Sequence, residues 1–288
     1  MRQRLYGYEP IEFEPRDEVG QVRRDWPATY QNIDSVIHLI AEEQARGRSV
    51  MIQAACNYLI TPTLAALRTA GIPFANPWRK KRGDWNPLSP GRGTSMGMRL
   101  AALITPPAQK RIWTAREAWQ WSEPLVAQGL FQRGRKAALK ALAASEQAEV
   151  GLRFDDLAGM YTADALTQLW AASYESSDNL AATTWWRDRL KPQAKSRATY
   201  PMRVLDRAGV AGLTEPPRCY VGTIHSFKGS EADTVIVYPD LSRAGDAEWH
   251  SSRPGGRNPV VRMGYVGVTR AREKLIICRA AKRTSMPL

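Results

Sequence analysis

The chain has 288 residues, 43% of them hydrophobic and 24% charged, which is ordinary for a soluble globular protein of one or two domains. Lysine and arginine number 41 against 28 aspartate and glutamate, so the formal net charge of +13 fits either a polyanionic partner or a generally basic surface. The sequence contains no signal peptide and no apolar run long enough to cross a bilayer, which excludes membrane insertion.

Cysteine usage indicates a reducing environment. Cys56, Cys219 and Cys278 stand far apart and form no C-x-x-C pair, so neither a disulfide framework nor a zinc site is expected. Cys278 ends a predicted buried strand and is expected to pack there as a small hydrophobic residue. We therefore expect a cytoplasmic protein.

The first convincing element along the chain is a helix over Gln31–Arg46. Apolar residues recur on one side of it, Asn32 or Asp34 is placed to cap its start, and Gly47 ends it. The polar segment before it has no clear period, and only Glu12–Glu14 there is consistent with a short edge strand.

Alternating elements follow this helix. Ser49–Ala55 is apolar and predicts a buried strand, and Thr61–Ala70 predicts a helix with Pro62 in its first turn and Gly71 just past its end. An extended segment is expected from Ile72. This helix–strand–helix–strand order fits one half of a parallel α/β domain.

The middle of the chain is different in character. Arg79–Arg82 is a run of cations in a segment rich in Trp, Gly and Pro, and is either a solvated linker or a contact to a DNA backbone near a domain junction. From Met98 to Leu190 the pattern is helical and Ala-rich, with the better candidates at Met98–Ile104, Ala115–Trp121, Gly134–Gln147 and Ala163–Ser173. Lys191–Pro217 is basic and Pro-bearing, and is expected to lead back to the α/β part.

Tryptophans are interleaved with Arg and Lys in this middle segment. Stacking on nucleic-acid bases is one interpretation. Tryptophans at helical spacing more often form a hydrophobic core, which is the interpretation we favour. The residues concerned are Trp113, Trp119, Trp121, Trp170, Trp185 and Trp186.

Two stretches near the C-terminus carry the candidate chemistry. In Tyr220–Asp240, an apolar run is followed by a polar loop and then by the β-branched run Thr234–Tyr238, and such a loop between strands is a common place for ligand contacts. In Arg262–Cys278, apolar residues at helical spacing predict a helix that carries Arg270 and Arg272 at its far end and leads directly into a strand over Leu275–Cys278.

Together these stretches resemble motifs V and VI of the superfamily 1 DNA helicases of the UvrD/Rep type. Tyr265–Ala271 matches motif VI without a gap. The residues that match motif V are Thr223, His225, Ser226, Lys228, Gly229 and Glu231.

The beginning of the chain is similar to the opening of the second RecA-like motor domain of that family, with Asn57 and Pro73-Phe74 in register. It also departs from the family pattern. Ala55 stands where the family has an arginine that contacts single-stranded DNA, and Asn76-Pro77-Trp78 replaces a glycine-aromatic stretch. The chain is therefore interpreted as a divergent member.

The resemblance and the element order together predict the fold class. We expect an α/β fold, a RecA-like parallel-sheet motor domain interrupted by a mostly α-helical insertion. Residues 1–79 would form the first part of the motor domain, residues 80–215 the helical accessory insertion, and residues 216–288 the second part with motifs V and VI.

The resemblance assigns nucleotide contacts to three residues. Arg270 would bring its guanidinium to the γ-phosphate of ATP, the alternative being a surface arginine that ends a helix. Glu231 would accept hydrogen bonds from the ribose, the alternative being a structural role, and Gly229 belongs to the same loop. Ser230 and Ala232 replace two apolar anchors of the family pattern, so this loop is expected to be held less rigidly.

DNA contacts are implied for Asn57, Thr223, His225 and Lys228. His225 is expected either to donate to a phosphate or to hold the loop through a backbone carbonyl, and it has no partners for a catalytic triad. Arg272 and Lys274 lie outside the catalytic set of the family and are expected to be solvated or DNA-facing. His38 and His250 lack companions for a metal site.

The elements that bind ATP phosphates and magnesium are missing. The chain has no G-x-x-x-x-G-K-[ST], since Gly91–Gly97 has the glycines but not the lysine, and Asp155-Asp156 does not end an apolar strand. The resemblance thus covers only the C-terminal half of a helicase. We expect no ATP hydrolysis by this chain alone, and we expect Mg²⁺ to be held by the missing domain.

The preferred interpretation is the second motor domain of an ATP-dependent DNA helicase, which the family implies moves 3′ to 5′ in repair, recombination or replication. Its partners would be single-stranded and junction DNA and a P-loop-bearing motor domain in cis or in trans. The main alternative is a non-catalytic DNA-binding or regulatory protein derived from the helicase fold. An RNA helicase relative is less favoured, because the residue pattern of motif VI is the one typical of DNA translocases.

Overall fold

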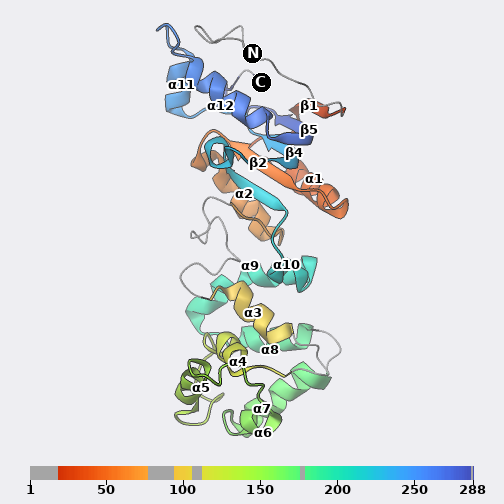
Figure 1. Cartoon of the computed structure of the whole chain (residues 1–288), viewed down its shortest axis with the longest axis vertical. Helices are drawn as coiled ribbons and strands as arrows, with labels where there is room; N and C mark the ends of the chain where they lie inside the picture. The colour runs from red at the N-terminus through yellow and green to blue at the C-terminus, as the bar shows by residue number, and fades with distance from the viewer. Residues whose placement is uncertain (1–18, 77–93, 106–111, 176–178, 287) are drawn as a thin grey trace. The chain divides into compact units, whose positions relative to one another are not determined.

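The computed structural model describes residues 19–76, 94–105, 112–175, 179–286 and 288. The predicted strand at Glu12–Glu14 and the basic run Arg79–Arg82 lie outside these residues. The chain divides into two compact units, Met1–Asn86 with Pro217–Leu288 and Pro87–Pro216. The first unit is therefore made from both ends of the chain, which are drawn in red and blue in Figure 1.

The first unit is built on a five-stranded sheet in which all neighbouring strands run parallel. The order is β1-β5-β4-β2-β3, so β2 lies between two strands that come from the other end of the chain. The predicted α/β fold with a parallel sheet is confirmed. The strands are β1 (Gln21–Trp26), β2 (Val50–Ala54), β3 (Cys219–Thr223), β4 (Ala232–Val237) and β5 (Ala271–Cys278).

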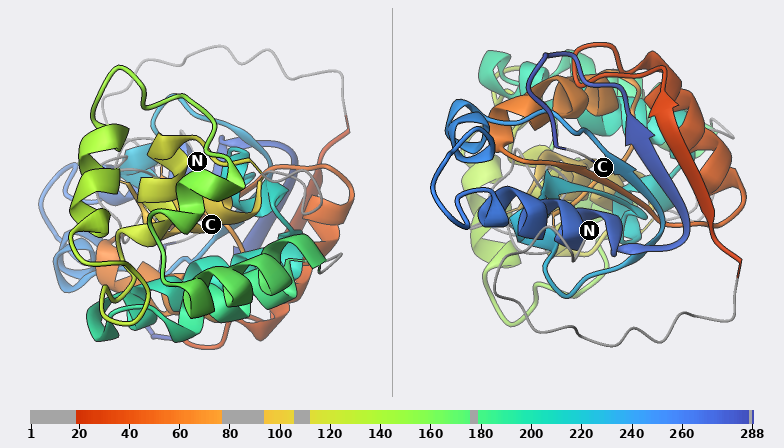
Figure 2. Two further views of the ribbon diagram at one scale, coloured as in Figure 1. Left: turned by 90° about the horizontal axis from the view of Figure 1, so that it is seen from below. Right: turned by 90° about the horizontal axis from the view of Figure 1, so that it is seen from above.

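Helices cover both faces of this sheet. Side chains along a strand point alternately to either face, and the central strands β2 and β4 are buried almost throughout, so both faces have to be covered. On one face, residues of β2 and β4 pack with the short 3-10 helix η5 (Ile224–Phe227) and with α12 (Asn258–Val268). On the other face lie α1 (Asp34–Ala45) and α2 (Asn57–Thr69), and the right-hand view of Figure 2 shows α12 across the strands from them. The helix α11 (Arg243–Trp249) precedes α12.

The starts of α1 and α2 differ from the prediction. The N-cap of α1 is Ile33, with no side-chain cap, so the expected cap by Asn32 or Asp34 is wrong, whereas Gly47 ends the helix with a φ of 73° as predicted. Because α2 begins at Asn57 rather than at Thr61, Pro62 lies inside the helix. A proline there removes one backbone donor, a loss that the buried face of the helix outweighs.

The sequence pattern missed several elements, including α11 and the two that follow. The edge strand β1 has a largely exposed surface and therefore shows no alternation of apolar residues, yet it pairs with β5 from Gln21↔Lys274 onward. The basic segment expected as a connection contains the 17-residue helix α9 (Pro192–Ala208) with Pro201 inside it.

The second unit is helical. Its tryptophans form an aromatic core: Trp113 and Trp121 have ring centroids 5.1 Å apart, and Trp186 Nε1 donates to the carbonyl of Trp121 at 2.7 Å. Trp113, Trp121, Trp185 and Trp186 are buried as predicted, but Trp170 is 36% exposed and packs against the exposed Phe154. The helices are α3 (Met96–Ile104), α4 (Ala115–Ser122), α5 (Arg135–Ala143), α6 (Phe154–Ala158), α7 (Ala163–Trp170), the π-helix Ala171–Glu175, α8 (Leu180–Asp188), α9 and α10 (Ala211–Thr214).

A buried carboxylate joins α1 to the sheet. Glu43 is fully buried and accepts hydrogen bonds from Thr234 Oγ1 of β4 at 2.9 Å and from Lys274 Nζ of β5. Arg46 and Arg48 approach the same carboxylate at 3.2 and 3.5 Å. Lys274 was expected to be solvated or DNA-facing; that prediction is wrong, because the lysine is the buried counter-ion of Glu43.

The acidity of Glu43 reflects this environment. Burial alone would raise its pKa, but hydrogen bonds from Lys274 and Thr234 and the charge of Lys274 together lower the pKa below its usual value of 4.5. A carboxylate with a lowered pKa stabilises the fold above its unfolded pKa, and this contribution is lost as the pH falls through the folded pKa.

We predict that Glu43→Ala lowers the free energy of unfolding by about 3–5 kcal/mol at neutral pH, because it leaves Lys274 buried without a counter-ion. Urea unfolding followed by circular dichroism measures this. Glu42→Ala, at the exposed neighbouring position, should change stability by less than about 0.5 kcal/mol. The Glu43 variant should also lose less stability than the wild type between neutral pH and a pH below 4.5. Equal losses for both variants at neutral pH would contradict the role of Glu43.

Candidate functional site

Arg270 lies between the end of α12 and the start of β5, and its side chain is half-buried. The prediction that Arg270 and Arg272 end the helix is wrong, because α12 stops at Val268 and Arg272 is already part of β5. Its Nε donates to the carbonyl of Val266 at 3.0 Å, its Nη2 donates to Thr269 Oγ1 at 3.0 Å, and its Nη1 is 3.5 Å from the carbonyl of Ser230. All of these acceptors are neutral, and among the described residues no carboxylate forms an ion pair with Arg270. Its guanidinium is therefore not held in an ion pair by any described acidic group.

The motif V loop, which connects β3 to β4, also contacts Arg270. Besides the contact at Ser230, the backbone N–H of Ala232 donates to the carbonyl of Arg270 at 3.1 Å. Glu231 lies between these two contact residues in the chain, and the exposed Gly229 before them adopts a φ of 85°, which glycine tolerates best. The tertiary structure thus brings Glu231 and Arg270 to the same place, at the amino ends of β4 and β5.

Ion pairs and hydrogen bonds fix the residues around Glu231. Its carboxylate forms a hydrogen-bonded ion pair with the exposed Arg272 at 3.2 Å, so Arg272 is solvated as expected. Asp233 accepts from the backbone N–H and the hydroxyl of Ser49 at 2.8 and 2.7 Å. Burial would raise the pKa of Asp233, but the bonds from Ser49 and the nearby Arg272 and Arg48 lower it. The start of β4 is therefore anchored to the start of β2.

Asn57, Thr223 and His225, three of the four residues with predicted DNA contacts, lie at the opposite edge of the sheet. Thr223 is the last residue of β3 and pairs with Ala54 at the end of β2, and Asn57 begins α2 directly afterwards. Because the strands are parallel, these positions lie on the side of the sheet at which the carboxyl ends of its strands meet, here called the carboxyl edge. His225 and Lys228 are exposed on the segment that returns from β3 toward the amino end of β4.

Ser226, rather than His225, fixes the start of this returning segment. Ser226 Oγ donates to the carbonyl of Thr223 at 2.7 Å, whereas no side-chain hydrogen bond of His225 is found within the described residues. The interpretation of His225 as the residue that holds the loop is therefore wrong. The imidazole is left exposed at the carboxyl edge.

A network that the sequence pattern missed supports Ser226. Asn76 is fully buried, and its Nδ2 donates to the carbonyl of Val221 and to Ser226 Oγ, both at 3.1 Å. Gly222 lies against this pair, and a Cβ there would overlap Asn76 Nδ2 and Ser226 Oγ. In the sequence, Asn76 was visible only as a departure from the family pattern, and its role depends on the approach of a distant strand.

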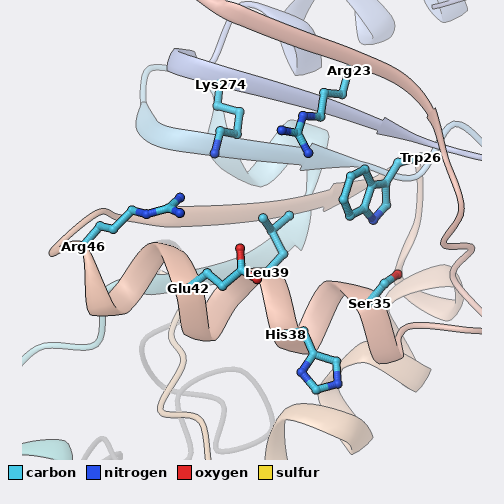
Figure 3. Close-up of a pocket in the computed structure, with 8 residues that line it drawn as sticks. All are labelled: Arg23, Trp26, Ser35, His38, Leu39, Glu42, Arg46 and Lys274. Carbon is cyan, nitrogen blue, oxygen red and sulfur yellow. The ribbon is translucent and has the colours of Figure 1, made fainter.

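A separate hollow of about 250 Å³ lies between α1, β1 and β5 (Figure 3). Arg23 and Lys274 extend into it from the strands, and Arg46 and Glu42 extend from α1. None of the predicted site residues lines it. Since Lys274 and Arg46 are both paired with Glu43, most of the positive charge in the hollow is already compensated.

Other kinds of site are not found in the part of the chain that the structure describes. No cluster of His, Cys, Asp or Glu there is arranged to hold a metal ion. Likewise, no helix within the described ranges is both long and apolar enough to span a membrane. Comparison of the chain with protein-family models and with curated proteins finds no match.

We predict that Gly222→Ala destabilises the first unit by roughly 1–3 kcal/mol, because the new methyl group overpacks the Asn76–Ser226 contact. Urea unfolding gives the loss, and faster amide exchange over residues 224–230 would locate it in the returning segment. Gly20→Ala is a matched control, because a Cβ there meets only the carbonyl of Glu273 at 3.4 Å. If the two variants are equally stable, the network does not fix the loop.

Proposed function

We propose that this chain is the second motor-domain portion of an ATP-dependent DNA helicase or translocase of the UvrD/Rep type. In this proposal it binds single-stranded and junction DNA and moves 3′ to 5′ in repair, recombination or replication. A separate P-loop-bearing domain, in cis or in trans, completes the ATP site. The chain by itself does not hydrolyse ATP, because it lacks the P-loop and the magnesium-binding acid.

The observation that carries the proposal is the contact between Arg270 and the motif V loop. The two motifs are far apart in the sequence, yet Arg270 contacts Ser230 and Ala232 on either side of Glu231. A planar, permanently charged guanidinium without a described carboxylate partner suits an incoming phosphate, since charge-assisted hydrogen bonds are stronger than bonds to neutral acceptors.

The residues present fit the part of ATP that a second motor domain contacts. Arg270 would exchange its neutral acceptors for oxygens of the γ-phosphate, where negative charge develops during cleavage. Glu231 would accept hydrogen bonds from the ribose after releasing Arg272, and an exposed ion pair of this kind is weak enough to exchange. ATP, with its Mg²⁺ held by the P-loop domain, would supply the anhydride whose cleavage drives movement.

The alternative, a non-catalytic DNA-binding or regulatory protein, is favoured by one observation. Ala55, at the position of the DNA-contacting arginine of the family, is half-buried and packs against the hydrophobic core beneath α12. That contact to DNA is therefore lost. The same alternative predicts DNA binding without any ATPase activity in every mixture with a P-loop partner.

We predict that Arg270→Ala abolishes DNA-stimulated ATP hydrolysis in the completed motor, with a loss on the order of 10³-fold or more, and leaves DNA affinity near that of the wild type. The assay mixes this chain with P-loop proteins from the same source and follows phosphate release. Arg262→Ala, at an exposed arginine of α12, the helix that precedes Arg270, is the control and should retain activity. A large loss of DNA binding by Arg270→Ala would contradict the assignment.

Affinity for single-stranded DNA should fall steeply with salt, with a log–log slope of about −0.7 for each phosphate contacted. This prediction follows from the net charge of +13 and from the exposed cations at the carboxyl edge. Fluorescence anisotropy over a salt series measures the slope. A flat response would remove the argument for backbone binding.

A further inference from the structure

An exposed aromatic ring adjoins the predicted DNA contacts at the carboxyl edge of the sheet. Tyr58 directly follows Asn57 and is 48% exposed, and its hydroxyl donates to the carbonyl of Leu241 at 3.3 Å. The Lys282 ammonium lies 5.0 Å from the centroid of the Tyr58 ring and 3.5 Å from its hydroxyl. Lys282 is also 5.8 Å from the ring of the buried Tyr30, so it lies near both tyrosines.

The backbone at Lys282 is fixed by a buried acid. The carboxylate of Asp240, which follows β4, is fully buried and accepts from the backbone N–H groups of Lys282 at 2.9 Å and Ala281 at 3.2 Å. The chain beyond is anchored as well, because the N–H of Met286 donates to the carbonyl of Pro239 at 2.7 Å. The exposed lysine therefore projects from an ordered backbone.

The strand order places this pair in line with the predicted DNA contacts. Along the sheet order β1-β5-β4-β2-β3, Lys282 follows β5, Tyr58 follows β2 and His225 follows β3, all beyond the carboxyl ends of parallel strands. Arg279 and Arg243, which follow β5 and β4, are exposed at the same edge and add positive charge. The edge thus combines an exposed ring with a row of cations.

We propose that Tyr58 and Lys282 form a nucleotide contact that extends the single-strand binding surface across the carboxyl edge. A base stacks on the exposed part of the Tyr58 ring while Lys282 neutralises an adjacent phosphate. Such a contact tolerates any base, because every base has a π-face, and it suits a protein that moves along DNA of any sequence. This inference rests on the proposed function, since it assumes that single-stranded DNA is the ligand.

The test uses the full chain and two fluorescein-labelled probes, an oligothymidylate about 16 nucleotides long and an abasic oligomer of the same length. Tyr58→Ala should weaken binding of the oligothymidylate about 5- to 150-fold and leave binding of the abasic probe unchanged, because only the former can stack. Tyr58→Phe keeps the ring and should bind like the wild type. Thermal unfolding by circular dichroism establishes that each variant is folded.

Lys282 has a different signature, because its contact is with phosphate. Lys282→Gln should weaken binding of both probes and make the log–log salt slope shallower by about 0.7. Lys140→Gln, at an exposed lysine of α5 in the second unit, removes the same charge elsewhere and should leave the slope near that of the wild type. If Lys140→Gln has the same effect as Lys282→Gln, the effect is one of net charge and the proposal is wrong.

The outcomes separate this inference from the proposed function. Wild-type binding that Tyr58→Ala and Lys282→Gln leave intact would overturn the nucleotide contact while the helicase proposal stands. Equal losses on the oligothymidylate and the abasic probe for Tyr58→Ala would also overturn it, since stacking would not be the cause. If the wild-type chain binds neither probe, both the inference and the proposed DNA-binding function fail.

Discussion

The parallel pairing of β2 with β3 and β4 is the constraint on which the rest of the first unit depends. Val50 pairs with Cys219 on one side and with Thr234 on the other, so residues separated by more than half of the chain occupy one register. A central parallel strand is buried on both faces, so contacts with water cannot replace its contacts with the neighbouring strands. The ends of the chain must therefore fold together, whatever the inserted helical unit does.

This pairing also separates the chemistry of the two edges of the sheet. The segment after β3 starts at the carboxyl edge and has to reach the amino end of β4, because β3 and β4 run in the same direction and β2 lies between them. One short segment thereby contributes His225 at one edge and Glu231 at the other. In the helicase interpretation, the nucleotide side and the DNA side of the motor are joined by these few residues, which gives a physical route for coupling them.

The stability of this arrangement depends on polar groups that are buried or half-buried and hydrogen-bonded. Glu43 joins α1 to β4 and β5, Asp233 joins the starts of β2 and β4, and Asn76 anchors the returning segment. Buried polar groups of this kind are costly when broken, so they fix one arrangement rather than add general stability.

Sequence alone determined the elements whose signals are local. The β-branched run at Thr234–Tyr238, the apolar spacing around Met263 and the glycine after α1 gave the strand, the helix and the helix end, since each depends on neighbours within one or two turns. The motif strings similarly identified Arg270 and Glu231 as a pair to examine together. The tryptophan-rich core was predictable for most of its members, because large aromatic side chains at helical spacing are buried when they can be.

Only the tertiary structure decided the features that depend on distant partners. The sequence predicts Lys274 as a surface cation, but the lysine is buried because it forms an ion pair with Glu43 of α1. The edge strand β1 and the role of Asn76 were invisible for the same reason, as was the approach of Lys282 to Tyr58 across the carboxyl edge. A single charged residue, a single amide or an exposed strand leaves no periodic pattern in the sequence. Its place in the structure depends on partners from distant segments, which only the folded chain brings together.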